Sequence, residues 1–196
     1  RFITNKSSGK QGYEIAKSLS KKGFDTTLIS GPTNLKIDDD VKLIEVETAD
    51  EMLLETQKNL PANVAVFSAA VADFKINKKY KYKIKKQDSL NLNLEKNVDI
   101  LSYVAKHNSK RPELVIGFAA ETDNLETAAR EKRIRKGCDW LIANHIVADA
   151  EQSVFGADTN QVLFISSDAC EEWPNLKKTD VARRIFDRME AWFDCD

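Results

Sequence analysis

The chain has 196 residues and an almost even balance of charge, which limits the classes of protein it can belong to. Lysine and arginine total 30, aspartate and glutamate total 31, and the net charge of −1 creates no global attraction to nucleic acid or to membrane surfaces. No apolar run reaches the length of a membrane span, and no signal peptide is visible. We therefore expect one soluble domain over residues 1–196.

Strand-like and helix-like segments alternate along the chain. A helical pattern over 10–19 follows Ser7-Ser8-Gly9 and ends at Gly23, and a serine at that place is expected to cap the helix. The further predicted elements are strands at 24–30, 42–46, 63–68, 90–94, 114–119, 140–143 and 161–166, and helices at 48–58, 99–108, 125–136 and 178–193. The alternation predicts a Rossmann-like, doubly wound α/β fold with a mostly parallel sheet.

Two of these strands have patterns that suggest their place in the sheet. The run at 63–68 is continuously apolar, which is typical of a central strand covered on both faces. The run at 90–94 alternates leucine with asparagine, which is typical of an edge or flap strand with one exposed face.

A lysine-rich segment follows the strand at 63–68. Seven lysines lie between Lys75 and Lys86, and Lys81, Lys83 and Lys85 would point to one side of an extended chain. Like-charged runs are usually only solvated, but cations beyond the end of a buried strand are also suited to a polyanionic ligand. We interpret the segment as a lysine-rich flap that becomes ordered when a nucleotide binds.

Two alternative functions must be weighed for this segment: reduction with a nicotinamide cofactor and binding of single-stranded nucleic acid. Tyr82 and Lys83-Ile84-Lys85-Lys86 have the Tyr-x-x-x-Lys spacing of nicotinamide-dependent reductases, but that spacing works on a helix, and this segment has no helical apolar stripe. Lysines interleaved with Tyr80 and Tyr82 could also bind single-stranded nucleic acid, although one basic run in a net-acidic chain is a small electrostatic footprint. We expect neither a nicotinamide cofactor nor a nucleic-acid partner.

Five ordered motifs carry a resemblance to a known family. They are Arg1-Phe-Ile-Thr-Asn5-Lys-Ser-Ser-Gly9-Lys-Gln-Gly12, Ala69-Ala-Val-Ala-Asp73-Phe, Lys83-Ile-Lys-Lys86, Gly117-Phe-Ala-Ala-Glu121-Thr and Lys132-Arg-Ile-Arg-Lys136. From Arg1 to about Asn160 the chain resembles phosphopantothenoylcysteine synthetase, the ligase half of the bacterial bifunctional coenzyme A biosynthesis protein. That family carries an initial strand before the first motif, so we expect the first strand to be missing from this chain. The family usually has Asn-Pro-Asp where this chain has Asn97-Val98-Asp99.

The resemblance implies a ligase that condenses 4′-phosphopantothenate with L-cysteine, driven by CTP and Mg²⁺ through an acyl-cytidylate. Attack of a carboxylate on an α-phosphorus needs positioning and charge neutralisation more than a protein nucleophile. A chain with many lysines and only two histidines suits that chemistry. The choice of CTP over ATP rests on the resemblance alone.

The resemblance also implies roles for individual residues. Asn5 and Lys83 would be catalytic, Asn5 through the acyl carbonyl and Lys83 through the triphosphate, while Lys85 and Lys86 would belong to the flap. Asp73 would bind the nucleotide and its Mg²⁺. Arg1, Asn5 and Ala70 would bind the acyl substrate. The nucleotide would be contacted by Phe67, Ser68, Ala69, Asp73, Lys83, Val98, Asp99, Ile100, Leu101, Phe118, Lys132 and Lys136.

Lys132 and Lys136 are four residues apart, so on a helix they would share one face, as two phosphate-facing cations should. Cys138, Cys170 and Cys195 lack the spacing of a metal site, which favours a reducing, cytoplasmic location.

We expect these cysteines, His107 and His145 to be structural. The resemblance implies a homodimer, paired through 90–94 or the strand near Gln161, and allows a fused phosphopantothenoylcysteine decarboxylase domain in the full-length protein.

Overall fold

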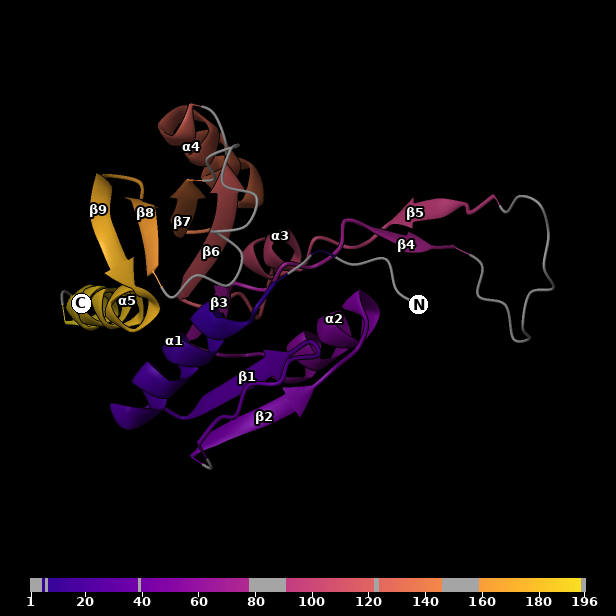
Figure 1. Cartoon of the computed structure of the whole chain (residues 1–196), viewed down its shortest axis with the longest axis horizontal. Helices are drawn as coiled ribbons and strands as arrows, with labels where there is room; N and C mark the ends of the chain where they lie inside the picture. Colours follow the sequence, from indigo (N-terminus) through magenta and orange to yellow (C-terminus); the bar gives the residue numbers. More distant parts are fainter. Residues whose placement is uncertain are drawn as a thin grey trace.

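The alternation of strands and helices expected from the sequence is present in the computed structural model, which describes residues 5, 7–38, 40–77, 91–121, 124–145 and 159–194. Figure 1 shows the arrangement of the elements. In chain order these are α1 (Lys10–Lys21), β1 (Thr26–Ser30), β2 (Val41–Glu45), α2 (Ala49–Lys58), β3 (Val64–Phe67), β4 (Phe74–Ile76), β5 (Leu94–Lys96), α3 (Ile100–Ala105), β6 (Leu114–Glu121), α4 (Leu125–Lys136), β7 (Trp140–His145), β8 (Thr159–Ile165), β9 (Cys170–Lys177) and α5 (Lys178–Phe193).

The largest sheet has five strands in the order β3-β6-β7-β8-β9. Strands β3, β6 and β7 run parallel, and β8 and β9 are antiparallel to their neighbours. One apolar cluster joins this sheet to α1 and α5, and a second joins it to α3 and α4. Helices on both faces of a mixed sheet with a parallel centre confirm the predicted α/β fold.

The sequence prediction missed β9 and assigned too much to α3. Strand β9 contains two glutamates and Pro174, a composition that argues against a central strand. The structure places β9 at the edge of the sheet, where a proline can be accommodated because one side of the strand has no ladder to complete. Helix α3 ends at Ala105 rather than 108, and His107 accepts hydrogen bonds from two backbone N–H groups of the turn that follows.

The prediction that the strand at 63–68 is central is wrong for the described residues. Within them, β3 pairs with β6 on one side only, and β1 and β2 form a separate parallel pair. Val64 and Val66 pack against the cluster that joins the sheet to α1 and α5, and Phe67 packs against the cluster of α3 and α4, so the apolar run of β3 reflects the cover on its two faces. The first strand expected before Arg1 stays a prediction.

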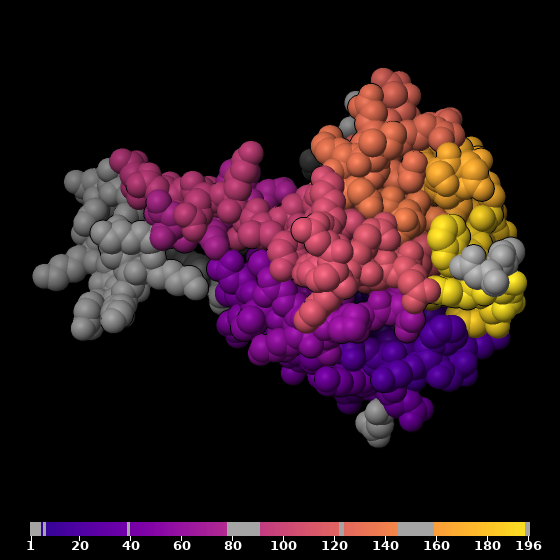
Figure 2. Space-filling model, turned by 180° about the vertical axis from the view of Figure 1, so that it is seen from behind, coloured from indigo at the N-terminus to yellow at the C-terminus, as the bar shows by residue number. Residues whose placement is uncertain are grey.

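A narrow antiparallel ribbon, β4 paired with β5, projects from the body of the molecule (Figures 1 and 2). The strand predicted at 90–94 overlaps the observed strand β5 only at Leu94, which pairs with Ile76 of β4. The backbone N–H of Asn97 donates to Asp73 O at 2.8 Å, and its side-chain Nδ2 donates to Ala72 O at 2.8 Å. We call this ribbon, residues 74–76 and 94–96, the arm. Asn97, which follows β5, is hydrogen-bonded to the two residues before β4, so it joins the two strands at the base of the arm.

The start of α1 differs in detail from the predicted serine cap. Gly9 occupies the N-cap with a φ of 71°, and an added Cβ would lie 2.9 Å from Thr33 Cγ2. The hydroxyl groups of Ser7 and Ser8 instead accept hydrogen bonds from the backbone N–H groups of Gly9 and Lys10. A glycine is therefore required at this turn. Across the described residues, none of the helices has the length and apolarity that crossing a membrane would need.

Candidate functional site

A cavity of about 920 Å³ runs along β3, with α3 and α4 at one end and α1, β1 and α5 at the other. It contains every predicted nucleotide-binding residue that the structure describes: Phe67, Ser68, Ala69, Asp73, Val98, Asp99, Ile100, Leu101, Phe118, Lys132 and Lys136. These residues come from five separate segments of the chain. The carboxyl ends of parallel strands meet at one edge of a sheet, which is where the loop after β3 begins.

Two glycines allow the helices to lie close to this edge. A Cβ at Gly12 on α1 would lie 2.8 Å from Ser68 Oγ, so α1 begins beside the carboxyl end of β3. A Cβ at Gly117 on β6 would lie 2.7 Å from a methyl group of Leu101, so α3 packs directly against the sheet. Both approaches bring loop backbone and helix starts to the same side of β3 and β6.

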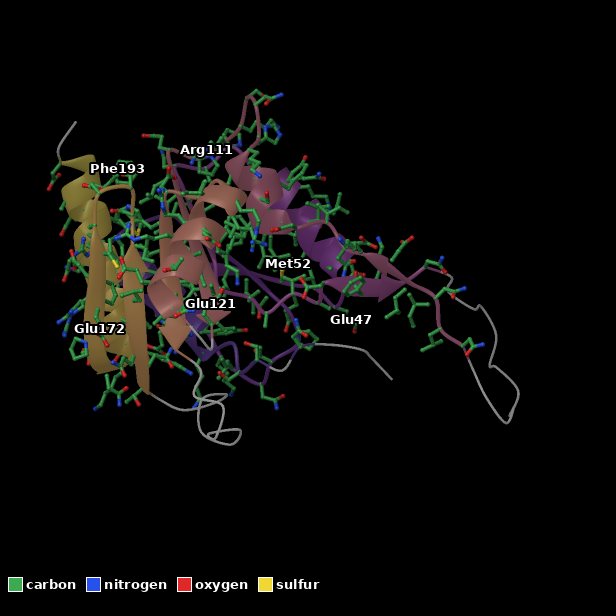
Figure 3. The ribbon with its side chains drawn as sticks, turned by 90° about the horizontal axis from the view of Figure 1, so that it is seen from above. Glu47, Met52, Arg111, Glu121, Glu172 and Phe193 are labelled. Atoms are coloured by element: carbon green, nitrogen blue, oxygen red, sulfur yellow. The ribbon has the colours of Figure 1, made fainter. Side chains whose placement is uncertain are left out.

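The predicted sharing of one helix face by Lys132 and Lys136 is confirmed, since both lysines line the cavity from α4. Lys132 Nζ lies 2.5 Å from Glu121 Oε1, at the end of β6. Figure 3 shows Glu121 at that strand end, close to α4. Lys136 Nζ pairs with Asp99 Oδ2, while Asp99 Oδ1 accepts a hydrogen bond from Ser102 N at 3.0 Å and so caps α3. Both cations are therefore balanced by carboxylates.

Asn5 lies next to the loop that follows β3, although 66 residues separate it from its partner in sequence. Its Nδ2 donates a hydrogen bond to Val71 O at 3.2 Å, which places Asn5 beside the predicted substrate residue Ala70. Asn5 and Ala70 do not line the cavity itself. The other predicted substrate residue, Arg1, and the flap residues Lys83, Lys85 and Lys86 lie outside the described residues.

Asp73, the predicted magnesium ligand, is exposed and lines the cavity at the base of the arm. A backbone hydrogen bond holds Asp73 in place, because Asp73 O accepts it from Asn97 N. In the part of the chain that the structure describes, no three metal-binding side chains come together. A metal here would thus take one carboxylate from these residues and its other ligands from elsewhere.

The described cysteines and histidine have surroundings that fit structural roles. Burial raises the pKa of the Cys138 thiol to about 11, so that it stays protonated and unreactive at neutral pH. Burial is also the main cause that raises the pKa of Cys170. The ring of His107 stabilises a turn. Cys195 and the side chain of His145 lie outside what the structure describes.

Two residues at the site were given no role from the sequence. Glu121 is the last but one residue of the fourth of the five motifs, and only its contact with Lys132 indicates what it does. Asn97 was noted for the missing proline after it, yet its side chain and backbone hold Ala72 and Asp73. The sequence drew attention to both positions. Residue spacing cannot show, however, that Glu121 contacts Lys132 or that Asn97 contacts Ala72 and Asp73.

Comparison with known proteins places the chain in a family. Residues 1–193 match the family described as DNA/pantothenate metabolism flavoprotein C-terminal domain. The chain is 36% identical over 199 aligned positions to the coenzyme A biosynthesis bifunctional protein CoaBC of Escherichia coli strain K12, covering 99% of this chain and 48% of that protein. Identity to the protein of the same name from Haemophilus influenzae is 40% over 191 positions, which cover 96% of this chain and 47% of that protein. The chain thus spans about half the length of these relatives.

A solved structure is similar over the whole chain. The crystal structure of the C-terminal domain of a coenzyme A biosynthesis bifunctional protein CoaBC superposes with a TM-score of 0.79 and 34% identity. The match covers 100% of this chain and 88% of that one. These findings agree with the resemblance carried by the five motifs. The chain belongs to the family of DNA/pantothenate metabolism flavoprotein C-terminal domains.

Proposed function

We propose that the protein is a ligase of coenzyme A biosynthesis that condenses 4′-phosphopantothenate with L-cysteine at the expense of CTP. One observation carries the proposal: the residues that the motifs predict to bind nucleotide line a single cavity, with Asn5 held beside it against Val71. The names of the relatives, bifunctional proteins of coenzyme A biosynthesis, support the same pathway.

The chemistry available in the cavity fits activation by a nucleotide. The described lining contains neither cysteine nor histidine, and activation by a nucleotide requires positioning and charge neutralisation more than a protein nucleophile. In the first half-reaction the substrate carboxylate attacks the α-phosphorus of CTP, and pyrophosphate leaves. Lys132 and Lys136 can neutralise the charge that develops on the phosphates, which is the main requirement for such a transfer.

In the second half-reaction the amine of cysteine attacks the acyl carbon of the acyl-cytidylate. The amide bond forms, the amine gives up a proton, and CMP leaves with the bonding electrons. The side-chain amide of Asn5 can donate a hydrogen bond to the acyl oxygen as negative charge develops there. Its present hydrogen bond to Val71 O keeps that amide at the loop after β3.

Magnesium fits the residues present at the cavity. Proteins usually hold Mg²⁺ through one or two carboxylates together with substrate phosphates rather than in an all-protein cage. Asp73, exposed at the cavity, would supply that carboxylate. When bound, Mg²⁺ would neutralise phosphate charge that the two lysines do not reach.

Three further expectations belong to the same proposal. The protein would act in the cytoplasm, and a decarboxylase domain would occupy the remaining half of a full-length bifunctional chain. It would also form a homodimer, which the exposed apolar side chains of the arm support: Phe74, Ile76 and Leu94 are each more than a third exposed. Paired arms would cover these side chains.

A nucleotide panel tests the proposal directly. The protein is incubated with 4′-phosphopantothenate, Mg²⁺ and CTP, ATP, GTP or UTP, without cysteine, and pyrophosphate release is measured. We expect release with CTP alone, followed by the phosphopantothenoyl-cysteine product once cysteine is added. Absence of pyrophosphate release with every nucleotide would reject the ligase, and oxidation of NADPH under the same conditions would favour the reductase instead.

A further inference from the structure

Both lysines of α4 that line the cavity are paired with carboxylates. Lys132 and Glu121 are mostly shielded from solvent, with side-chain exposures of 26% and 19%. Lys136 and Asp99 are at 26% and 42%. The two pairs tie one face of α4 to the end of β6 and to the N-cap residue of α3. Any anion that binds these lysines must therefore compete with Glu121 and Asp99.

The geometry of the Lys132–Glu121 pair favours exchange. Lys132 Nζ lies 2.5 Å from Glu121 Oε1, and both side chains keep part of their surface exposed. The attraction between them is electrostatic, so a phosphate group, which carries more negative charge than one carboxylate, can compete with Glu121 for Lys132. An ammonium group carries three N–H donors, so Lys132 can donate to a phosphate oxygen without leaving its helix face.

Asp99 can release its lysine for a different reason. Its Oδ1 atom caps α3 through Ser102 N, and only Oδ2 contacts Lys136. The cap remains when Lys136 turns to a ligand, so helix α3 does not depend on the ion pair. At this end of the cavity the described charges are Lys132 and Lys136 against Asp73 and Asp99, with Glu121 behind them, so the cations are not in excess.

We propose that Glu121 and Asp99 are built-in counter-ions that compete with phosphate groups for Lys132 and Lys136. They keep both ammonium groups at the cavity wall in the absence of ligand. They also take the lysines back as pyrophosphate and CMP leave, which weakens the binding of anionic products and speeds their release. The inference rests on the proposed function of the cavity, and it makes Glu121 a positioning residue that acts through Lys132.

The proposal gives a prediction of unusual sign: removing the carboxylate should tighten anion binding. Glu121→Gln keeps the shape of the side chain and removes its charge. We expect the dissociation constants of pyrophosphate and of CTP to fall about 3- to 10-fold, the range expected for losing one competing charge near a protein surface. We expect kcat to fall as well, because product release becomes slower, while KM for CTP falls with it.

Isothermal titration with inorganic pyrophosphate and with CTP measures the effect on the whole protein. The matched control is Glu126→Gln, which breaks the 2.9 Å pair between Glu126 and Arg130 on an exposed part of the same helix. This variant should leave both dissociation constants unchanged. Asp99→Asn is the second test, because asparagine caps a helix as well as aspartate does and only the charge is lost. It should tighten binding in the same direction.

The outcomes separate the two proposals. If the parent protein binds neither CTP nor pyrophosphate, the proposed function itself fails. If the parent binds them but Glu121→Gln and Asp99→Asn bind with equal or weaker affinity, the carboxylates are structural and the counter-ion proposal is wrong. Thermal unfolding of each variant distinguishes a local effect on binding from a loss of fold, since a destabilised protein would not bind more tightly.

Discussion

The half of the molecule built on β6, β7 and β8 is closed, whereas the half built on β1, β2 and β3 is open. In the closed half, Leu114–Ile116 and Leu141–Ala143 are completely buried. In the open half, β1 and β2 have mostly exposed or partly buried residues, and β3 is the edge of its sheet. Between the edges of β1 and β3 the cavity continues, lined by residues 26–29 and 63–67. A core closes only where each strand has two neighbours.

Among the described strands, β1 and β3 each pair on one edge only, and both line the cavity. Helix α1 starts beside the carboxyl end of β3 and leads into β1, so the chain enters α1 from the edge at which a parallel strand in the gap would end. A strand there, connected through α1 to β1, would form the usual right-handed crossover. Unpaired backbone groups along the edges of β1 and β3 would then find partners.

The largest expected effect tests this gap. A form of the protein extended before residue 1 by the preceding strand should slow amide exchange in β1 and β3 by at least about 10³-fold. Edge amides exchange through local opening, whereas central amides approach the global stability of about 5–15 kcal/mol. Hydrogen exchange by mass spectrometry measures it, with β7 as the internal reference. Equal amide exchange rates of β1 and β3 in the two forms would show that no added strand pairs with them.

A core truncation should affect the closed half far more than a similar change in the open half. Ile142→Ala removes a side chain with 0% exposure at the centre of the five-stranded sheet, and should cost about 2–5 kcal/mol of unfolding free energy. Leu43→Ala, on β2 and 36% exposed, should cost less than about 1 kcal/mol. Urea denaturation provides both values. Similar losses would mean that the two halves share one core.

Asn5 connects the segment before α1 to the loop after β3, and Asn5→Asp should interrupt catalysis without unfolding either half. A carboxylate cannot donate to the acyl oxygen, so the acyl-cytidylate should accumulate while product formation falls about 10²- to 10³-fold. Mass spectrometry of the quenched reaction detects the intermediate. Asn108→Asp, the same change in an exposed turn, serves as the control. Product formation at the parent rate would remove Asn5 from the second step.

The smallest effect concerns pH and the closed half. Burial raises the pKa of Cys138 from 9.0 to about 11, so the folded state binds the thiol proton more tightly than the unfolded state. This contribution, about 2–3 kcal/mol, is complete below pH 9 and is lost as pH rises toward 11. Cys138→Ala should therefore lose less stability than the parent between those values. Parallel curves of unfolding free energy against pH would contradict the assignment.

Local patterns predicted most of the fold, and the failures have physical causes. Apolar periodicity and capping signals identified α1, α2 and α5, because those helices bury one face or begin with a recognisable cap. Helix α4 was also predicted, although it buries only Ala129 and has no side-chain cap. Strand β9 was missed because an edge strand tolerates charge and proline. The predicted central position of β3 was wrong for the described strands. An apolar run shows that both faces of a strand are covered, and it does not show whether a strand pairs with each edge.

The candidate site was predictable in composition but not in geometry. Motifs at the ends of strands converge by the rules of parallel sheets, so a shared cavity could be expected for Asp73, Phe118 and Lys132. The pairing of each lysine with a carboxylate could not, since it depends on side-chain directions across three elements. The hydrogen bond from Asn97 Nδ2 to Ala72 O depends in the same way on tertiary geometry.

The base of the arm would couple assembly through the arm to nucleotide binding in the cavity, if both occur. Asn97 holds Ala72 and Asp73, and the next residue, Val98, already belongs to the cavity wall. A partner that grips the arm therefore restrains the same backbone that a nucleotide would contact. Such linkage is reciprocal: if assembly through the arm changes nucleotide affinity by some factor, nucleotide binding must change the strength of assembly by the same factor. Association through the arm and binding in the cavity would then be coupled to each other.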